Sequence, residues 1–210
     1  MNLKNIIRIL LGIATIILAY FIFESIMEPQ RYETLRAQRE VEVVNRLRDI
    51  RTVQVAHRHA TGRFISTLDS LVMFLEHGQL PTIRRTGYIP EDMTEVEALR
   101  LGLITRDTIF TNAHATLFPH REDKAVHLAN LRYIPFTNRT VEFTMETGFV
   151  TRSHIEVPVI EVSAPWKAFM SEPRWRQIVA NNSQRAIDIN RFPGRRFGSM
   201  TEPILEGNWE

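Results

Sequence analysis

The sequence ILLGIATIILAYFIF occupies residues 9–23 and contains no charged residue. The three residues before it include an arginine whose long side chain can reach the membrane surface, and together they bring the stretch to about the length that crosses a bilayer. Tyr20, Phe21 and Phe23 stand near its end, where aromatic rings favour the membrane–water interface. The sequence therefore predicts a transmembrane helix over residues 6–23.

A cleaved secretory signal peptide is the alternative, because Lys4 and Arg8 could form its basic start. Cleavage requires small residues near the end of the apolar run, where this chain has Phe23 and Glu24. We therefore expect an uncleaved anchor. Lys and Arg residues are nearly balanced on its two sides, so their count does not decide the orientation.

The composition limits the function classes. The chain has 26 basic and 24 acidic residues, a formal net charge of +2 and no long block of one sign, which gives nucleic-acid binding little support. It has no cysteine, so disulfides, thiolate catalysis and cysteine-ligated zinc are excluded. About 185 residues follow the anchor, enough for one core.

A long amphipathic helix is predicted after the anchor. Pro29 should kink or briefly interrupt the helix, because proline lacks a backbone donor and clashes with the preceding turn. Residues 31–59 contain no glycine or proline, and a narrow apolar stripe follows the helical period. Joined to the anchor, the helix would cover about fifty residues, on the order of 80 Å.

The stripe on this rod is a candidate interface, formed by Leu35, Val43, Leu47 and Ile50. Some of it could instead pack on the rest of the protein. In that alternative Leu47, Ile50 and Val53 are covered, and Leu35 with Val41 or Val43 remains for a partner.

Two short helices are predicted next by their capping residues. Ser66, with Asp69 three positions later, opens the first helix, which Gly78 ends. Thr94 and Glu97 have the spacing of a capping box and open the second.

Beyond Leu103 the period shifts toward two, and a turn is expected at Thr147-Gly148. Pro158 places its strand at an edge or a bulge, so Ile155, Val157 and Val159 form a candidate edge for the addition of a partner strand. The predicted strands cover residues 107–111, 128–135, 139–145 and 154–163.

The remaining segments are predicted as helices from about Pro165 and from Pro173 to Ile187, followed by an extended tail over residues 192–210. Trp209 would have to fold back to be covered, which would make the C-terminus a clasp. The predicted fold is α+β: anchor 1–27, long helix 28–62, and a head 63–210 with a mostly antiparallel sheet.

Within the anchor, Gly12, Thr15 and Ala19 lie on one helical face, where small residues let two membrane helices approach closely. Small residues are also common in membrane helices without such a role. The three small residues are therefore a candidate packing surface, and incidental composition is the alternative explanation.

No catalytic, cofactor or metal motif is found. His57 and His59 point to different helix faces, and the remaining histidines lack ligand spacing, so solvated or capping roles are expected. No nucleophile motif and no phosphate-binding glycine loop occurs. The basic segment 194–198, GRRFG, could touch an anion, although a solvated loop is favoured. We expect a non-enzymatic protein without cofactor.

The order of parts resembles type IV pilins and the pseudopilins of type II secretion. The most specific stretches are RDIRTVQVAH at 48–57, GRF at 62–64 and LDSL at 68–71. The chain lacks the Gly-Phe cleavage site and the early glutamate of that family. As a whole it is also similar to a family of single-pass membrane proteins of Bacteroidota, on PEDMTEVEALRLGLITRDTIF, LRYIPF and the closing GNWE. That likeness implies an inner-membrane anchor with a periplasmic head, and implies no activity.

Two functions follow as hypotheses. The first is a non-enzymatic structural subunit of a bacterial cell-envelope assembly, with the membrane and either envelope proteins or its own copies as partners. The second is a membrane-tethered module in the periplasm that binds a ligand or peptide or senses one.

Overall fold

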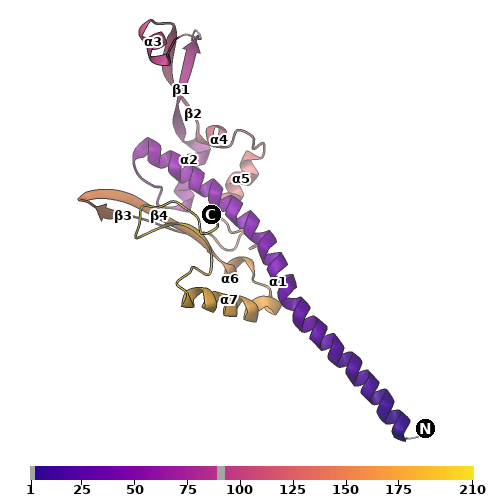
Figure 1. Cartoon of the computed structure of the whole chain (residues 1–210). Coiled ribbons are helices and arrows are strands. Elements are labelled where there is room, and N and C mark those ends of the chain that lie inside the picture. The colour runs from indigo at the N-terminus through magenta and orange to yellow at the C-terminus, as the bar shows by residue number, and fades with distance from the viewer. Residues whose placement is uncertain (1–2, 89–92) are drawn as a thin grey trace.

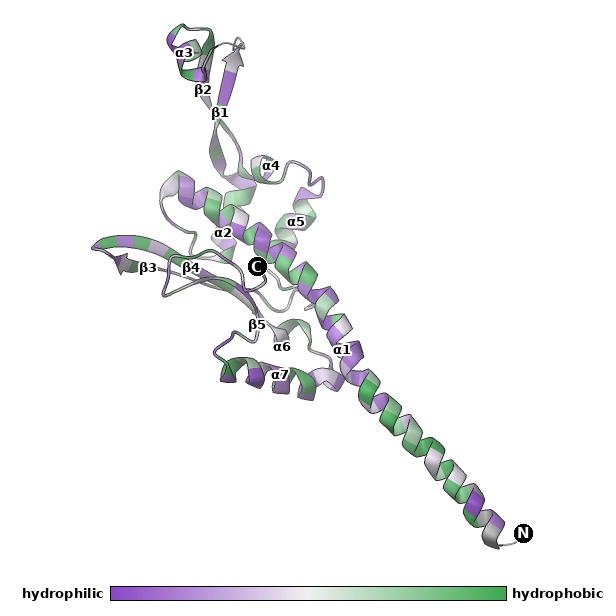
Figure 2. Ribbon diagram, viewed as in Figure 1, coloured by the Kyte–Doolittle hydropathy of each residue, from purple (hydrophilic) through white to green (hydrophobic). Residues whose placement is uncertain are grey.

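The computed structural model describes residues 3–88 and 93–210. One helix, α1 (Leu3–Thr61), runs for 59 residues from the N-terminal end into the head (Figure 1). At 1.5 Å per residue it is about 90 Å long. Its N-terminal part is long and apolar enough to cross a membrane, and none of that apolar window is buried. Figure 2 shows this end hydrophobic, whereas the part of α1 inside the head alternates between hydrophilic and hydrophobic residues.

Pro29 lies inside α1 and does not interrupt it, so the expected interruption is wrong. Proline removes the N–H that the carbonyl of Ser25 would accept in a regular helix. Both residues are exposed, and water can satisfy that carbonyl. The apolar N-terminal part of α1 and the head are thus joined by continuous helix.

The core of the head is built around the C-terminal half of α1. Tyr32, Val43, Leu47, Ile50 and Val53 have no exposed surface and belong to the same apolar cluster as the buried residues of the head. Their spacing of three and four puts them along one face of the helix. The predicted border at residue 62 therefore divides a single core.

Two antiparallel sheets complete the head, which confirms the α+β class and the antiparallel pairing. The first pairs β1 (Gln79–Gly87) with β2 (Ile104–Asn112) over their whole length. The second has the order β3-β4-β5, from β3 (Thr144–Arg152), β4 (Ile155–Pro165) and β5 (Gly194–Ser199). Both β1 and β5 were missed by the sequence pattern, because β1 carries Pro81 and β5 lies in the Gly-rich tail.

The predicted turn at Thr147-Gly148 is wrong. Both residues lie inside β3, opposite Ile160 and Val159. The chain reverses instead at Ser153-His154, where both residues have positive φ (50° and 67°) as a two-residue hairpin turn requires.

The short helices agree only partly with the sequence. Thr67, not Ser66, caps α2 (Leu68–His77), and its side chain accepts a hydrogen bond from the Ser70 N–H; Gly78 is the C-cap as predicted. The capping box of Thr94 and Glu97 is present at α3 (Glu95–Arg100). The remaining helices are α4 (Ala113–Leu117), α5 (Lys124–Leu131), α6 (Trp166–Phe169), the 3-10 turn η1 (Pro173–Trp175) and α7 (Arg176–Asp188).

The strand predicted over residues 128–135 is wrong, because its first half is the end of α5. Leu128 and Leu131 are buried three residues apart, which is a helical spacing. The strand predicted over 139–145 is reduced to the start of β3 and an isolated bridge between Tyr133 and Glu142.

The C-terminal residues fold back on the head. Gly207 bridges to Phe197 of β5, and the Glu210 carboxylate accepts a hydrogen bond of 2.7 Å from Arg51 of α1. Trp209 is half-buried against the core. The C-terminus is a clasp on α1 and β5.

A substitution of Gln54 of α1 tests the packing of this helix in the head. It is fully buried, its Nε2 donates to the Ile65 carbonyl at 2.9 Å, and its Oε1 accepts from the Ile65 N–H at 2.8 Å. Gln54→Leu leaves the buried N–H and carbonyl of Ile65 without their hydrogen-bond partner, so we expect a loss of about 3 kcal/mol in the free energy of unfolding. Urea unfolding of the full chain in detergent micelles, followed by tryptophan fluorescence, measures it. Gln38→Leu, on the exposed face of α1, is the control, and equal stability of both variants would contradict this role of Gln54.

Candidate functional site

The β1–β2 hairpin and α3 form an arm, residues 79–88 and 93–112, that projects from the head. Figure 1 shows the arm at the end of the molecule opposite the N-terminus. Among the described residues of the arm, those at its base hold it to the head: Leu80 is buried, and Asn112 Nδ2 donates to the Glu76 carbonyl at 3.1 Å. Beyond the base most of the described residues of both strands are exposed.

One face of the hairpin carries large apolar side chains that face solvent. Phe110 lies opposite Pro81 and Ile83 lies opposite Thr108, so Ile83 and Phe110 are diagonal neighbours on the same face. Their exposed fractions are 67% and 66%. Around α3 and its junction with β2, further large apolar side chains are exposed, namely Tyr88, Val96, Leu99, Leu101 and Leu103.

The tip is held by polar contacts around α3. Glu95 accepts a hydrogen bond of 2.8 Å from Arg106 and lies 3.6 Å from Arg85, and the bond from Arg106 lowers the pKa of Glu95. The Thr94 hydroxyl and N–H both donate to Glu97, which lowers the pKa of that carboxyl. Buried Ala98 and Ile104 seat α3 on the end of the hairpin.

This geometry is typical of a contact surface. A two-stranded hairpin exposed on both faces has little stability of its own in water. Apolar patches on exposed elements mark sites of interaction. Hydrophobic side chains at the tip and on one strand face of the arm are left uncovered by the rest of the described chain.

A second polar feature lies at the base of the arm. His114 of α4 and His127 of α5 are buried, with 3.1 Å between His114 Nε2 and His127 Nδ1. His127 Nε2 lies 3.5 Å from the Asp49 carboxylate of α1, which also accepts a 2.7 Å bond from Arg121. Burial, followed by the neighbouring His127, lowers the pKa of His114. The sequence prediction of solvated or capping roles is wrong for this pair, because helices α4 and α5 bring the two rings together.

The lowered pKa of His114 predicts acid sensitivity. As the pH falls through about 6.5, an unfolded histidine takes up a proton before folded His114 does. The contribution of His114 to the free energy of unfolding is therefore constant above that pH. It decreases below that pH until the folded group also takes up a proton. We expect the melting temperature of the full chain in detergent to fall between pH 7.5 and 5.5, and to fall less in His114→Gln. His120→Gln, at an exposed position, should keep the wild-type profile, and parallel profiles for all three proteins would contradict the prediction.

The predicted rod interface lies largely inside the head. Val43, Leu47 and Ile50 have no exposed surface, and Leu35 is half-buried against the core. The interface prediction is wrong for the first three, because the head itself covers the apolar stripe. Of the residues considered for a partner, Val41 stays 58% exposed.

The membrane seam makes no contact with the rest of the described chain. Gly12, Thr15 and Ala19 are exposed, and a Cβ at Gly12 would meet no atom within 4 Å. The Thr15 hydroxyl donates to the Leu11 carbonyl at 2.9 Å within the helix. The seam is free for another helix.

The candidate edge for strand addition is unpaired over only the first part of β4. Strand β4 pairs with β3 from Ile155 to Ser163, whereas β5 covers β4 only from Ile160 to Pro165. Ile155, Val157 and Val159 therefore have a paired strand on one side only, among the described residues. Ile155 is 66% exposed but Val159 is buried, so this edge offers a partner little apolar surface.

No protein-family model, curated protein or solved structure matches this chain. The likeness to pilins and to single-pass proteins of Bacteroidota stays an expectation. Within residues 3–88 and 93–210, no three His, Asp or Glu side chains are placed to share a metal ion. The arm was not predicted from the sequence. Apolar residues between positions 96 and 110 can be read from the sequence, but the sequence does not show that they are exposed to solvent.

Proposed function

We propose that this protein is a non-enzymatic structural subunit of a bacterial cell-envelope assembly, anchored in the inner membrane by α1 and binding a partner protein through the arm. The observation that carries the proposal is the projecting arm with its exposed apolar face and tip. The head is proposed to lie in the periplasm, as the likeness to pilins and to Bacteroidota proteins suggests.

The continuous helix supports an uncleaved anchor. The apolar window of α1 is unburied and passes without a break into a helix whose other end is the core of the head. A chain of this shape holds its head at a fixed distance from the bilayer. The arm then reaches away from the membrane, toward a partner in the same compartment.

The arm can be tested in native membranes by site-specific photo-crosslinking. A photoreactive amino acid at Val96 should give a crosslinked adduct, identified by mass spectrometry, whereas the same group at Phe149 on the other hairpin should not. Ile83→Ser with Phe110→Ser should weaken the adduct about tenfold or more, because two exposed apolar contacts are lost.

The matched control for that variant is Val126→Ser with Phe149→Ser, an apolar and exposed pair outside the arm. This control should keep the adduct. Adducts from position 149 together with none from position 96 would refute the arm as the contact. The mass of the adduct also distinguishes a second copy of this chain from another envelope protein.

The anchor seam gives a separate test. Gly12→Leu with Ala19→Leu should leave membrane insertion unchanged, since both changes are apolar, and should reduce helix association, because the larger side chains separate the helices. Alkaline extraction measures insertion, and energy transfer between labelled chains in vesicles measures association. Ala14→Leu, on another helix face, is the control; unchanged association in the double variant would show that the segment is only a tether.

A further inference from the structure

A cleft of about 560 Å³ lies between the middle of α1, the second half of α7 and strand β5. Five arginines line it and none of its lining residues is acidic. Asparagine side chains and two aromatic rings, Trp166 and Phe192, complete the wall. The five arginines are Arg36, Arg185, Arg191, Arg195 and Arg196.

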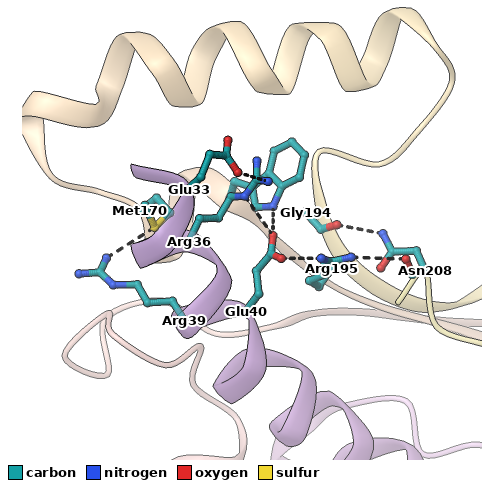
Figure 3. Close-up of polar contacts among 9 residues, drawn as sticks. Glu33, Arg36, Arg39, Glu40, Met170, Gly194, Arg195 and Asn208 are labelled. Carbon is teal, nitrogen blue, oxygen red and sulfur yellow. Dashed lines mark hydrogen bonds and ion pairs between the residues drawn. The ribbon is translucent and has the colours of Figure 1, made fainter. Parts of the chain in front are cut away.

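Two of these arginines are held by a buried carboxylate (Figure 3). Glu40 of α1 is 8% exposed, accepts a bond of 2.5 Å from Arg195, and lies 3.7 Å from Arg36 Nε. Its other oxygen accepts from the Trp166 indole N–H at 2.7 Å. Glu40 thus fixes the positions of both guanidinium groups at the cleft.

The β5 wall is fixed by Asn208 of the C-terminal clasp. Asn208 Nδ2 donates to the Gly194 carbonyl at 2.9 Å, and its Oδ1 accepts from the Arg196 N–H at 3.2 Å. Arg196 in turn lies 3.3 Å from Glu161 of β4. The wall is therefore formed before any ligand arrives.

The cleft keeps unneutralised positive charge. Glu33, Glu40 and Glu161 are the carboxylates that reach these five arginines. Arg185 and Arg191 form no ion pair within 4 Å among the described residues, and both are exposed. The buried Nε atoms of Arg36 and Arg195 also have no hydrogen-bond partner in the described part of the chain. Because these Nε atoms are closed to solvent, an anion in the cleft would contact the exposed part of each arginine side chain instead.

We propose that this cleft binds the oxyanion group, phosphate or carboxylate, of a small soluble ligand. Guanidinium groups match both oxyanions through paired N–H donors. The volume lies within the range of about 300–1,000 Å³ that small-molecule sites occupy. Arg185 and Arg191 at the mouth attract the anion, and the preset Arg36 and Arg195 receive it.

The position of Arg36 favours a soluble ligand over a lipid headgroup. It follows Phe23 by thirteen residues on the same helix, which is about 20 Å along the axis. The headgroup region extends only about 5–8 Å beyond the hydrocarbon on each side. A usual helix tilt of about 20° shortens the height of Arg36 by little.

Calorimetric titration tests the site with the full chain in phosphatidylcholine nanodiscs at low salt. Inorganic phosphate and citrate are the two probes, and they separate phosphate from carboxylate recognition. We expect saturable binding of at least one probe, weakened tenfold or more in Arg185→Gln with Arg191→Gln. Arg100→Gln with Arg176→Gln removes the same charge from exposed positions outside the cleft and should bind as wild type does.

Three results would overturn the assignment. The first is no saturable binding of either probe by the wild-type chain. The second is equal weakening in the cleft variant and its control, which would mean a general charge effect. The third is binding that disappears when phosphatidylglycerol is added to the nanodisc, which would assign the cleft to lipid headgroups. All four substituted arginines are exposed, so an unchanged melting temperature verifies that each variant is folded.

Discussion

The burial of one face of α1 inside the head is the constraint on which the rest of the structure depends. Tyr32, packed edge-on against Trp175 at 5.7 Å, is fully buried, and it follows Phe23 by only nine positions. No flexible linker separates the apolar window from the core. A rigid helix of about 14 Å between them therefore couples the orientation of the head to that of the apolar segment.

Because of this coupling, the arm and the arginine cleft have fixed positions relative to the apolar end of α1. The arm extends from the end of α1 that is farthest from the anchor (Figure 1). The cleft is built on Arg36, near the point where α1 enters the core. The proposed partner on the arm and the proposed anion in the cleft would thus lie at different distances from the apolar end of α1.

The sequence predicted those parts of the fold that local patterns determine. The long helix and the Thr94–Glu97 capping box follow from spacing and hydrogen-bonding chemistry over a few residues. Strand β5 could not be read in this way, because Gly194 and Gly198 suggest a loop until β4 pairs with them. The cleft depends on Arg36 and Arg195, 159 positions apart in the chain. For the GRRFG segment a solvated loop was favoured over an anion contact, because only the fold brings Glu40 and α7 beside it.

The apolar stripe of α1 is buried in the head, which is why we expect assembly contacts elsewhere than on this helix. A helix with a narrow stripe can bury it against its own chain or against another, and here the head takes Val43, Leu47 and Ile50 completely. Stability of the head therefore does not require a second chain at the rod. The apolar side chains that remain exposed outside the anchor include a group on the arm, from Ile83 to Phe110. The described part of the two-stranded arm leaves these side chains uncovered, and the proposal is that a partner protein covers them.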